Sequence, residues 1–396
     1  MKLSNFKNIT PQALAQELDA QGREALLERF TSLGLPSKKS EEYRYFDVEK
    51  RLEVEYQTLD YVPKNIVRGE NIKVVDGVVV SAPKGMRVYY EACGAIDMEH
   101  FDPLYYLGHL LSPITIKIEI DGDAEVEIEH HFTKSDALIN YRIVLYNQAN
   151  RHSTLYENFF AKGIENTLVL YGYDMHVAKD STLRVVKKHI MENTNYSIIG
   201  SHKINVAKNA NSLFKSFDFG SGQALQLLKV ELEEYAHMDA AHLLYLNDDA
   251  KRGTVSQIVH KGEHSTSTQE AKNILDGSAR GIFDALIKVE PTGKYTKAHQ
   301  NSKAILLHDK AYMAGKPQLE IYIDELEASH GATTGQLNPK QLFYLQSRGI
   351  SYLEARKILV IAFANTLIET VKDTRQQERI KASFEKVFYA GHKEYL

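Results

Sequence analysis

The stretch from Lys316 to Gly349, KPQLEIYIDELEASHGATTGQLNPKQLFYLQSRG, contains the signals that decide the fold. Residues 317–326 alternate apolar and polar side chains at the two-residue period of a β-strand. Residues 328–335 are small apart from one imidazole, that of His330, and this composition predicts a compact turn. A helix start follows directly. The sequence therefore places His330 between a sheet-like region and a helical region.

Helices are predicted at both ends of the chain. Asn338 supplies an N-cap, and Pro339 occupies the first helical position, where its missing N–H costs no hydrogen bond. A Ser-x-x-Glu capping box at Ser351 starts a second helix, and an apolar stripe predicts a last helix over residues 373–388. Near the N-terminus, a Thr-Pro pair and a leucine-rich stripe predict a helix over residues 10–34.

From about Asn71 to Leu326 the chain is a succession of short β-rich runs without amphipathic helices between them. The run Ile114–Ile120 alternates without a break. The other runs are Tyr141–Tyr146, Thr167–Tyr173, Thr182–Val186, Leu225–Leu232, Thr254–Val259 and Ile282–Val289. Because repeated βαβ units need crossover helices, this pattern argues against them and leaves a sandwich, a barrel or a solenoid.

A weak internal period distinguishes these three folds. Four alanines follow an apolar run and precede a polar turn at one constant spacing: Ala149, Ala178, Ala207 and Ala236. Gly262 and Pro291 continue the series at similar spacings. A period of roughly 20–50 residues without helices indicates a β-solenoid. A chance alignment of alanines is the alternative, and the Asp-Gly dipeptides at 76, 121 and 276 are typical of hairpins that a solenoid does not need.

Composition and charge exclude several function classes. The 396-residue chain is 43% hydrophobic with a net charge of −4, so it can bury a sizeable core and has no basic excess for nucleic acid. No apolar run approaches the roughly 20 residues of a membrane span, and the start lacks the apolar core of a secretory signal. We therefore expect a cytoplasmic protein that binds neither membrane nor nucleic acid. The chain has no Walker A phosphate loop and is not expected to hydrolyse ATP.

Few residues suggest chemistry. The single cysteine, Cys93, excludes a disulfide within the chain, and the histidines show no zinc-binding spacing. His330 can ligate iron or carry a proton near neutral pH, although residue types alone also allow a structural ring bonded to a nearby carbonyl. The acidic residues between Glu320 and Glu327 could form an acid–base pair, but a solvated strand face is the simpler interpretation.

Several segments strongly resemble the SufD family, the scaffold subunits of the SUF iron–sulfur cluster assembly machinery. The specific segments are PQLEIYIDELEASHGATTGQL at 317–337 and LFYLQSRGI at 342–350, with a continuation upstream through 301–307. A second region, PSKKSEEYRY at 36–45, is similar to the family's early motif. The order of these segments extends the resemblance over most of the chain.

This resemblance implies a right-handed parallel β-helix core and a non-catalytic scaffold that pairs with a SufB subunit through β-helix edges. It implies a nascent iron–sulfur cluster, transient and shared with SufB, for which His330 is the ligand or proton carrier. Some family members carry a cysteine two residues before this histidine, where this chain has Ala328. Because a cluster normally needs about four ligands, a chain with one thiol has to share them at an interface. Without SufB, we expect two copies to pair through the same surface.

The resemblance also implies that a separate ATPase, SufC, docks on the C-terminal helical region. The docking region would comprise Gln341–Gly349 and the helix from Ser351 to about Thr366. The residues singled out as contacts are Leu342, Phe343, Tyr344, Leu345, Arg348, Gly349 and Ala355. Packing of the same apolar residues against the end of the solenoid is the alternative.

Three parts are therefore expected: a helical region over 1–70, a parallel β-helix over 71–330, and a helical, SufC-docking region over 331–396. Two other functions stay open. A SufB-like subunit would itself carry a sulfur-accepting cysteine near the end of the solenoid, from which Cys93 is far in sequence. A polysaccharide-active β-helix enzyme would line one solenoid face with carboxylates.

Overall fold

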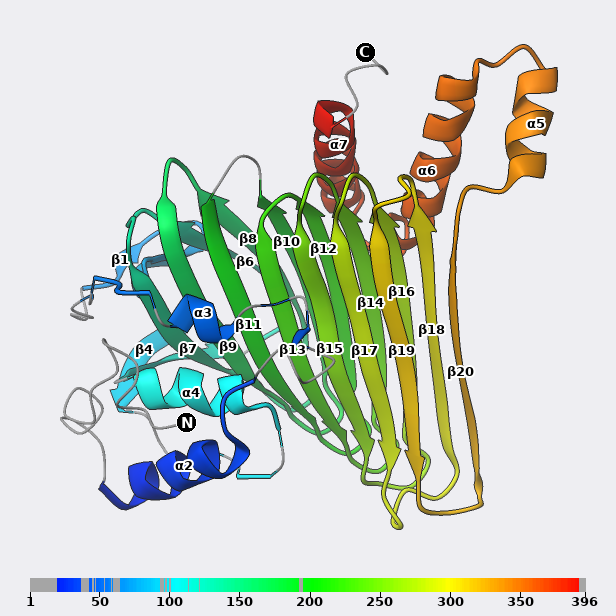
Figure 1. The fold of residues 1–396 in the computed structure, drawn as a ribbon. Helices are drawn as coiled ribbons and strands as arrows, with labels where there is room; N and C mark the ends of the chain where they lie inside the picture. Colours follow the sequence, from blue (N-terminus) through cyan, green and yellow to red (C-terminus); the bar gives the residue numbers. More distant parts are fainter. Residues whose placement is uncertain are drawn as a thin grey trace.

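The computed structural model of the chain describes residues 20–36, 43–44, 46, 48–52, 54–57, 59, 65–92, 96, 98–99, 101–112, 114–120, 122–191 and 195–391. A parallel β-solenoid of about seven turns forms most of the molecule, with helices near both ends of the chain (Figure 1). The β-solenoid expected from the alanine period is confirmed. The predicted helix over 10–34, the early motif at 36–45 and Cys93 lie partly or wholly outside the described residues.

Each turn of the solenoid contributes one strand to each of two sheets. The eleven-stranded sheet contains, in spatial order, β1 (Val67–Arg68), β3 (Val78–Ala82), β2 (Ile72–Val75), β6 (Ala124–Phe132), β8 (His152–Ala161), β10 (Thr182–Met191), β12 (Asn211–Gly220), β14 (His237–Leu246), β16 (Thr266–Leu275), β18 (Thr296–Leu306) and β20 (Leu326–Gly335). The nine-stranded sheet contains β19 (Tyr312–Ile321), β17 (Arg280–Val289), β15 (Lys251–His260), β13 (Gln223–Leu232), β11 (Asn195–Val206), β9 (Glu165–Val177), β7 (Leu138–Asn147), β5 (Ile114–Ile120) and β4 (Arg87–Ala92).

The length of one coil varies around the predicted period. Val177 pairs with Val206, and Val206 pairs in turn with Leu232, so the second of these coils is shorter than the first. Ala207 directly follows Val206, whereas Ala236 lies well beyond Leu232, so these two alanines do not stack. The period therefore identified the coil correctly, while the alanines that revealed it occupy different corner positions.

Two of the three Asp-Gly dipeptides form different kinds of turn, and Asp121 of the third lies outside the described residues. Asp76 and Gly77 have positive φ angles of 47° and 86° and join β2 to β3 in an antiparallel hairpin, as their sequence predicts. Gly277, with a φ of 59°, instead lies at a corner that carries the chain from β16 in one sheet to β17 in the other. The same left-handed backbone thus serves a hairpin in one place and a solenoid corner in another.

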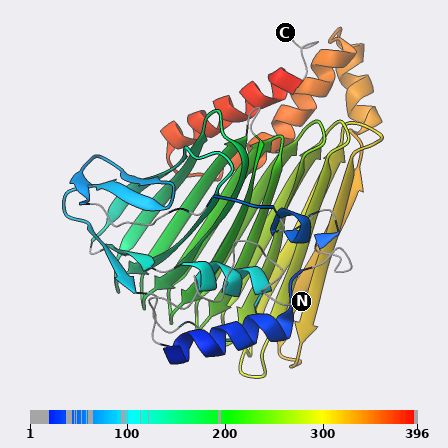
Figure 2. The same cartoon turned by 60° about the vertical axis from the view of Figure 1, so that its left-hand side comes forward.

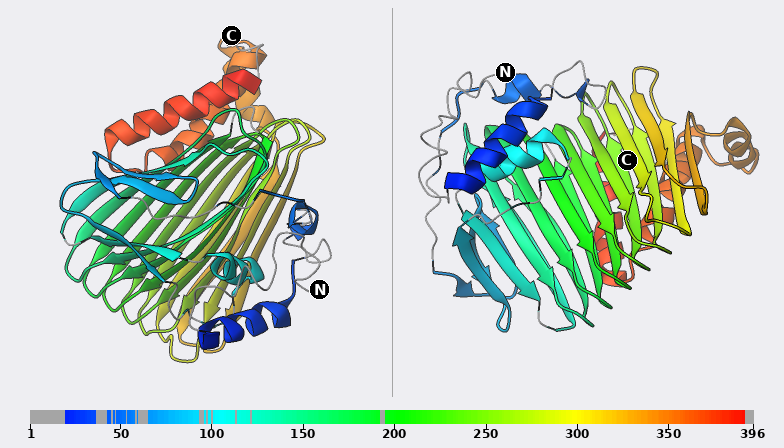
Figure 3. Two further views of the ribbon diagram at one scale, coloured as in Figure 1. Left: turned by 90° about the vertical axis from the view of Figure 1, so that its left-hand side faces the viewer. Right: turned by 90° about the horizontal axis from the view of Figure 1, so that it is seen from below.

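Helices cover the outer face of each sheet (Figures 2 and 3). On the nine-stranded sheet, α2 (Ala20–Leu33) and α4 (Pro103–Leu111) pack over the strands, and a short α3 (Val48–Leu52) joins the same cluster. On the eleven-stranded sheet, α6 (Tyr352–Ile368) and α7 (Thr374–Gly391) do the same. The apolar side predicted for the last helix is buried there: Ile380, Phe384, Val387 and Phe388. None of the helices in the described part of the chain is both long and apolar enough to span a membrane.

Helix α4 interrupts the region that was expected to contain strands alone. Asp102 caps it by accepting a hydrogen bond from the Leu104 N–H at 2.8 Å, and Pro103 occupies its first turn. Every residue from Leu104 to Leu110 is buried, so the segment has no polar face. Amphipathic periodicity therefore could not reveal this helix, because a helix buried on all sides lacks that signal.

The turn predicted for residues 328–335 is wrong, because these residues form strand β20. Small residues are compatible with a strand here because β20 pairs in register with β18 along its whole length. This pairing satisfies the peptide groups on the side of β20 that faces β18, whatever the side chains are. The helix α5 (Pro339–Ser347) then begins as predicted, with the Asn338 side chain accepting from the Lys340 N–H at 2.9 Å.

Candidate functional site

His330 lies on β20, which is the last strand of the eleven-stranded sheet. It pairs in register with Gln300 of β18, which in turn pairs with Gln269 of β16. Both glutamines are buried inside the solenoid, at 2% and 1% exposure. His330 continues their inward-facing row, but it is exposed because no described coil follows it.

The ring of His330 has no hydrogen-bonding partner among the described residues. A different histidine makes a hydrogen bond nearby. His299, on the opposite face of the sheet, has its Nδ1 2.8 Å from Ser329 Oγ. The alternative of a structural ring bonded to a carbonyl therefore does not describe this histidine. Both nitrogens of His330 can meet a ligand that approaches the end of the solenoid.

The end of the solenoid leaves an unpaired edge on each sheet. β19 and β20 are the last strands in the spatial order of their sheets (Figure 1). The last apolar cluster is incompletely covered: Ile287, Val289 and Ala298 are buried, while Leu319, Ile323 and Leu326 around them are only partly buried. Ile321 and Tyr322 are 40% and 59% exposed. Unpaired strand edges beside apolar side chains are a template for pairing with another chain.

The acidic residues near this end are solvated, as the simpler interpretation expected. Glu320, Asp324, Glu325 and Glu327 are all exposed. Glu327 makes an ion pair with Lys297 at 3.0 Å on the neighbouring strand. These carboxylates form a polar rim beside the apolar end.

The interior of the solenoid contains an unexpected set of charged and polar groups. Four successive strands place one such residue in a single inward-facing row: Glu157, Lys187, Ser216 and His242. Lys187 Nζ donates to Gln226 Oε1 at 3.0 Å from the opposite sheet, and Ser216 Oγ lies 2.8 Å from His242 Nδ1. Burial, reinforced by the charge of Lys187, lowers the pKa of His242 to about 3. This histidine is therefore a neutral core residue and is not solvated.

Beside this row, a buried ion cluster joins the two sheets. Arg252 is completely buried and forms an ion pair with Asp218, whose carboxylate also lies 3.2 Å from His189 Nδ1. Burial alone would raise the pKa of Asp218, but the charges of Arg252 and His189 lower it well below its usual range. His189 Nε2 lies 2.9 Å from the Tyr196 hydroxyl. The ion pairs of the cluster join the two sheets inside the core, although Arg252 Nε and His189 Nδ1 make no hydrogen bond with another described residue.

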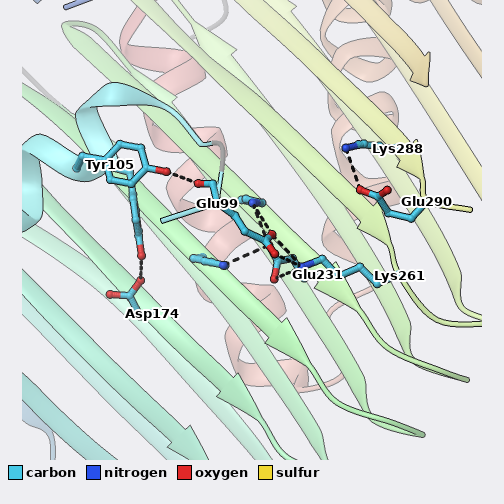
Figure 4. Close-up of polar contacts among 10 residues, drawn as sticks. Glu99, Tyr105, Asp174, Glu231, Lys261, Lys288 and Glu290 are labelled. Atoms are coloured by element: carbon cyan, nitrogen blue, oxygen red, sulfur yellow. Dashed lines mark hydrogen bonds and ion pairs between the residues drawn. The ribbon is translucent and has the colours of Figure 1, made fainter. Parts of the chain in front are cut away.

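The nine-stranded sheet carries a cavity of about 760 Å³ on its outer face, beside the segments around Leu35 and Phe101. Glu99 and Lys261 line this cavity, and Figure 4 shows both meeting Glu231 in one ion cluster. Three lysines surround the Glu231 carboxylate at 3.2, 2.9 and 3.1 Å: Lys203, Lys229 and Lys261. Lys261 Nζ also donates to both carboxylate oxygens of Glu99 at 2.8 Å.

The pKa shifts in this ion cluster do not favour acid–base chemistry. Burial lowers the pKa of Lys203 to about 8, with Glu231 opposing the shift. For Glu231 itself, burial raises the pKa, but its hydrogen bonds and the lysine charges outweigh burial and lower it. An ionised, ion-paired carboxylate is a poor general acid, so these residues do not favour a polysaccharide-active enzyme.

Helices α5 and α6 present an exposed apolar surface, which we call the α5–α6 patch. Its exposed members are Phe343 (72%), Tyr344 (57%), Tyr352 (51%), Leu353 (39%) and Ile358 (38%). Helix α5 has no buried residue and projects away from the strands (Figure 1). Packing against the end of the solenoid is therefore not the role of this helix. Single apolar residues are common on surfaces, but five exposed ones on two successive helices make this region a candidate interaction site.

The other residues predicted to contact a partner take different places. Leu342 and Leu345 are half-buried on α5. The Arg348 guanidinium lies over the Tyr344 ring, 5.3 Å from its centroid, and Gly349 ends the helix with a φ of 84°. Ala355 is buried in α6 and does not belong to the patch. Tyr352 and Leu353 begin α6, within the helix that was expected to take part in docking, and both are exposed.

Comparisons with known proteins identify one family. The family model described as "SUF system FeS cluster assembly, SufBD core domain" matches residues 130–363, which include β20, His330 and the α5–α6 patch. The chain is 34% identical over 129 residues to the iron–sulfur cluster assembly protein SufD of Escherichia coli, covering 33% of this chain. It is 28% identical over 283 residues, 70% of this chain, to a SufBD family iron–sulfur cluster assembly protein of Mycobacterium tuberculosis.

These matches cover less than two thirds of each relative. The matched segments span 30% of the E. coli protein and 63% of the M. tuberculosis protein. For the SufBD family protein of Synechocystis, which is 29% identical over 179 residues, the share is 40%.

Proposed function

Because the chain belongs to the SufBD family of SUF-system iron–sulfur cluster assembly proteins, we propose that it is a SufD-type scaffold subunit without catalytic activity of its own. It pairs with a SufB-type subunit, binds a SufC-type ATPase, and takes part in assembling a cluster at the subunit junction. The observation that carries this proposal is the open end of the solenoid, where His330 lies beside two unpaired strand edges.

The pairing surface follows from the two unpaired edges. A second solenoid that adds a strand to β19 or β20 satisfies peptide groups that now face solvent. It also covers the partly buried apolar side chains around Val289 and Ala298. Backbone hydrogen bonds and apolar burial together account for a stable junction. In the absence of a SufB-type subunit, a second copy of this chain occupies the same surface.

His330 is the residue of this chain that meets the cluster, which is cargo and not a resident cofactor. Its ring nitrogens have no described partner, and a neutral imidazole is a good ligand for iron. A cluster normally needs about four ligands, mostly thiolates. This chain has one cysteine, so the thiolates come from the SufB-type subunit and the imidazole completes the set.

Replacing His330 with alanine tests this role. We expect the complex with SufB-type and SufC-type partners to form normally, because the ring is exposed and supports no described contact. The iron and acid-labile sulfide recovered with the complex should fall about tenfold or more, since losing one ligand weakens a metal site at least this much. The measurement is co-purification followed by iron and sulfide analysis.

His299→Ala provides the matched control. His299 is also exposed and lies on the neighbouring strand, but it faces Ser329 on the opposite side of the sheet. Normal iron content in His299→Ala with reduced iron in His330→Ala supports the proposal. Loss of the complex in His330→Ala would make this histidine a structural residue, and unchanged iron would exclude it as a ligand.

The ATPase docks on the α5–α6 patch. Replacing Phe343, which is 72% exposed, with aspartate should weaken binding of a SufC-type ATPase roughly 30-fold, as expected for an aromatic anchor worth about 2 kcal/mol. Isothermal titration with the purified ATPase measures this change. Val67→Asp is the control, because Val67 is 61% exposed on β1, at the opposite end of the eleven-stranded sheet from β20. Equal weakening by both substitutions, or by neither, would contradict docking at the patch.

A further inference from the structure

A second cavity, of about 790 Å³, lies on the outer face of the eleven-stranded sheet beside helix α7. Its aromatic and basic lining residues come from β6, β8, the residue after β8, β10 and the helix: His131, Phe132, Phe159, Phe160, Lys162, Lys188 and Lys386. None of the described residues that line it is an aspartate or a glutamate. The cavity is separate from both the solenoid end and the α5–α6 patch.

One wall of this cavity is a short stack of rings. His131 and Phe160 are register partners on β6 and β8, and their rings stack with centroids 4.8 Å apart and planes 17° apart. His131 forms one face of the stack, and Phe160 is still 45% exposed. The register pairs of β8 with β10 end at Asn158 and Lys188, so Phe160 has no described register partner on β10. Ile190, two residues beyond Lys188, also lines the cavity and has no ring. A planar ligand stacked on Phe160 would continue this stack of rings.

Lys188 places a positive charge in the cavity without a described counter-charge. This ammonium is half-buried, and it makes no hydrogen bond or ion pair within the described part of the chain. Burial lowers the pKa of Lys188, and the charge of Arg379 lowers it further, against the opposing effect of Glu127. A half-buried lysine without a partner is stabilised by an anion that enters beside it.

The nearest carboxylates are already engaged. Glu127 accepts a hydrogen bond from Asn158 Nδ2 at 2.8 Å and lies 3.6 Å from the Arg379 guanidinium. Glu129 lies 2.9 Å from His131 Nε2 and accepts from Asn71 Nδ2 at 3.0 Å. Neither forms an ion pair with Lys188. The anion that fits here therefore comes from a ligand.

We propose that this cavity binds a nucleotide-sized ligand, namely a planar aromatic ring that carries a phosphate monoester. The ring stacks on Phe160, and the phosphate lies among Lys162, Lys188 and Lys386. Lysine binds phosphate as a point charge, which suits a dianion. The polar side chains Asn158 and Thr133 line the cavity but are already hydrogen-bonded to Glu127 and Asp76. The site therefore recognises stacking and charge more than base identity.

Isothermal titration of the full chain with AMP, CMP, adenosine and inorganic phosphate tests this site. We expect saturable binding of both nucleotides within a few-fold of each other, and binding about tenfold weaker for adenosine and for phosphate alone. Lys188→Met and Phe160→Leu should each weaken AMP binding about tenfold. Lys179→Met, at an exposed corner where Lys179 lies 3.6 Å from Asp180, should leave it unchanged.

Three results would overturn the assignment. Absence of AMP and CMP binding would exclude a nucleotide site, and equal binding of inorganic phosphate would reduce it to a simple anion site. Binding that neither Lys188→Met nor Phe160→Leu weakens would place the ligand elsewhere. Circular dichroism verifies that each variant is folded, and Lys188→Met is expected to be at least as stable because it removes an unpaired, half-buried charge.

Discussion

Replacing Asp218 with leucine is expected to lower the free energy of unfolding by about 3–5 kcal/mol, because it leaves the charge of Arg252 without its carboxylate partner. Arg252 is completely buried between the two sheets, and its other described hydrogen bond is with the Ser221 carbonyl. A guanidinium cannot lose its proton to escape this environment. Urea denaturation followed by circular dichroism measures the change, since the chain has no tryptophan for fluorescence.

The double variant Asp218→Leu with Arg252→Met separates charge from packing. Replacing both members of a buried ion pair with apolar residues is often neutral, so the double variant should recover most of the lost stability. A double variant as unstable as Asp218→Leu would show that the pair contributes through packing or through His189. A loss below about 1 kcal/mol in Asp218→Leu would show that water reaches the cluster and screens Arg252.

Replacing Ile321 with lysine is expected to weaken pairing with a SufB-type subunit about 100-fold, because it places an unpaired ammonium in an apolar junction. Ile321 is 40% exposed at the end of β19 and pairs in register with the fully buried Val289. The fold should be unaffected, since the side chain faces solvent in the isolated chain. Analytical ultracentrifugation of the pair measures the dissociation constant.

Val67→Lys is the control for this substitution. Val67 is also an aliphatic strand residue, 61% exposed, but it lies on β1 at the opposite end of the eleven-stranded sheet. Unchanged pairing in Val67→Lys is expected. If Ile321→Lys pairs as tightly as the unmodified chain, or if both variants weaken equally, the open end is not the junction.

Local signals in the sequence predicted much of this architecture. The helix starts at Asn338 and Ser351 are confirmed by side chains that accept from the backbone N–H groups of Lys340 and Glu354. These features depend on residues close in sequence, which is why they can be read without a structure. The solenoid followed from a period that survives even though coil length varies, because every coil has to close the same circuit through two sheets.

The failures have physical causes as well. Residues 328–335 look like a turn because their composition is small and polar, yet pairing with β18 makes them a strand. Helix α4 was missed because it is buried on nearly every side. Charged residues in an alternating strand predict a solvated face, but Asp218 and Arg252 meet inside the solenoid from two strands that are far apart in the sequence. Such non-local contacts cannot be predicted from the sequence of either strand alone.

Some residues of the candidate sites could be predicted from the sequence, and others could not. His330 could be singled out from its resemblance to a family motif, but its exposure at an unpaired edge depends on which strand is last in the sheet. The exposed rings on α5 were predicted as partner contacts, whereas Ala355 was included although it is buried. No sequence motif identifies Lys188 and Phe160, because they come together in one cavity only when three strands and one helix pack side by side.

Hydrogen–deuterium exchange of this chain, with and without a SufB-type subunit, tests most directly whether the partner docks at the open end of the solenoid. The account predicts that amides between Tyr312 and Gly335 exchange about tenfold or more slowly in the complex, because a new strand covers β19 and β20. Amides of the interior strands β8 to β12 should be unchanged. Unaltered exchange over 312–335 in a complex that has formed, with protection elsewhere, would contradict the account.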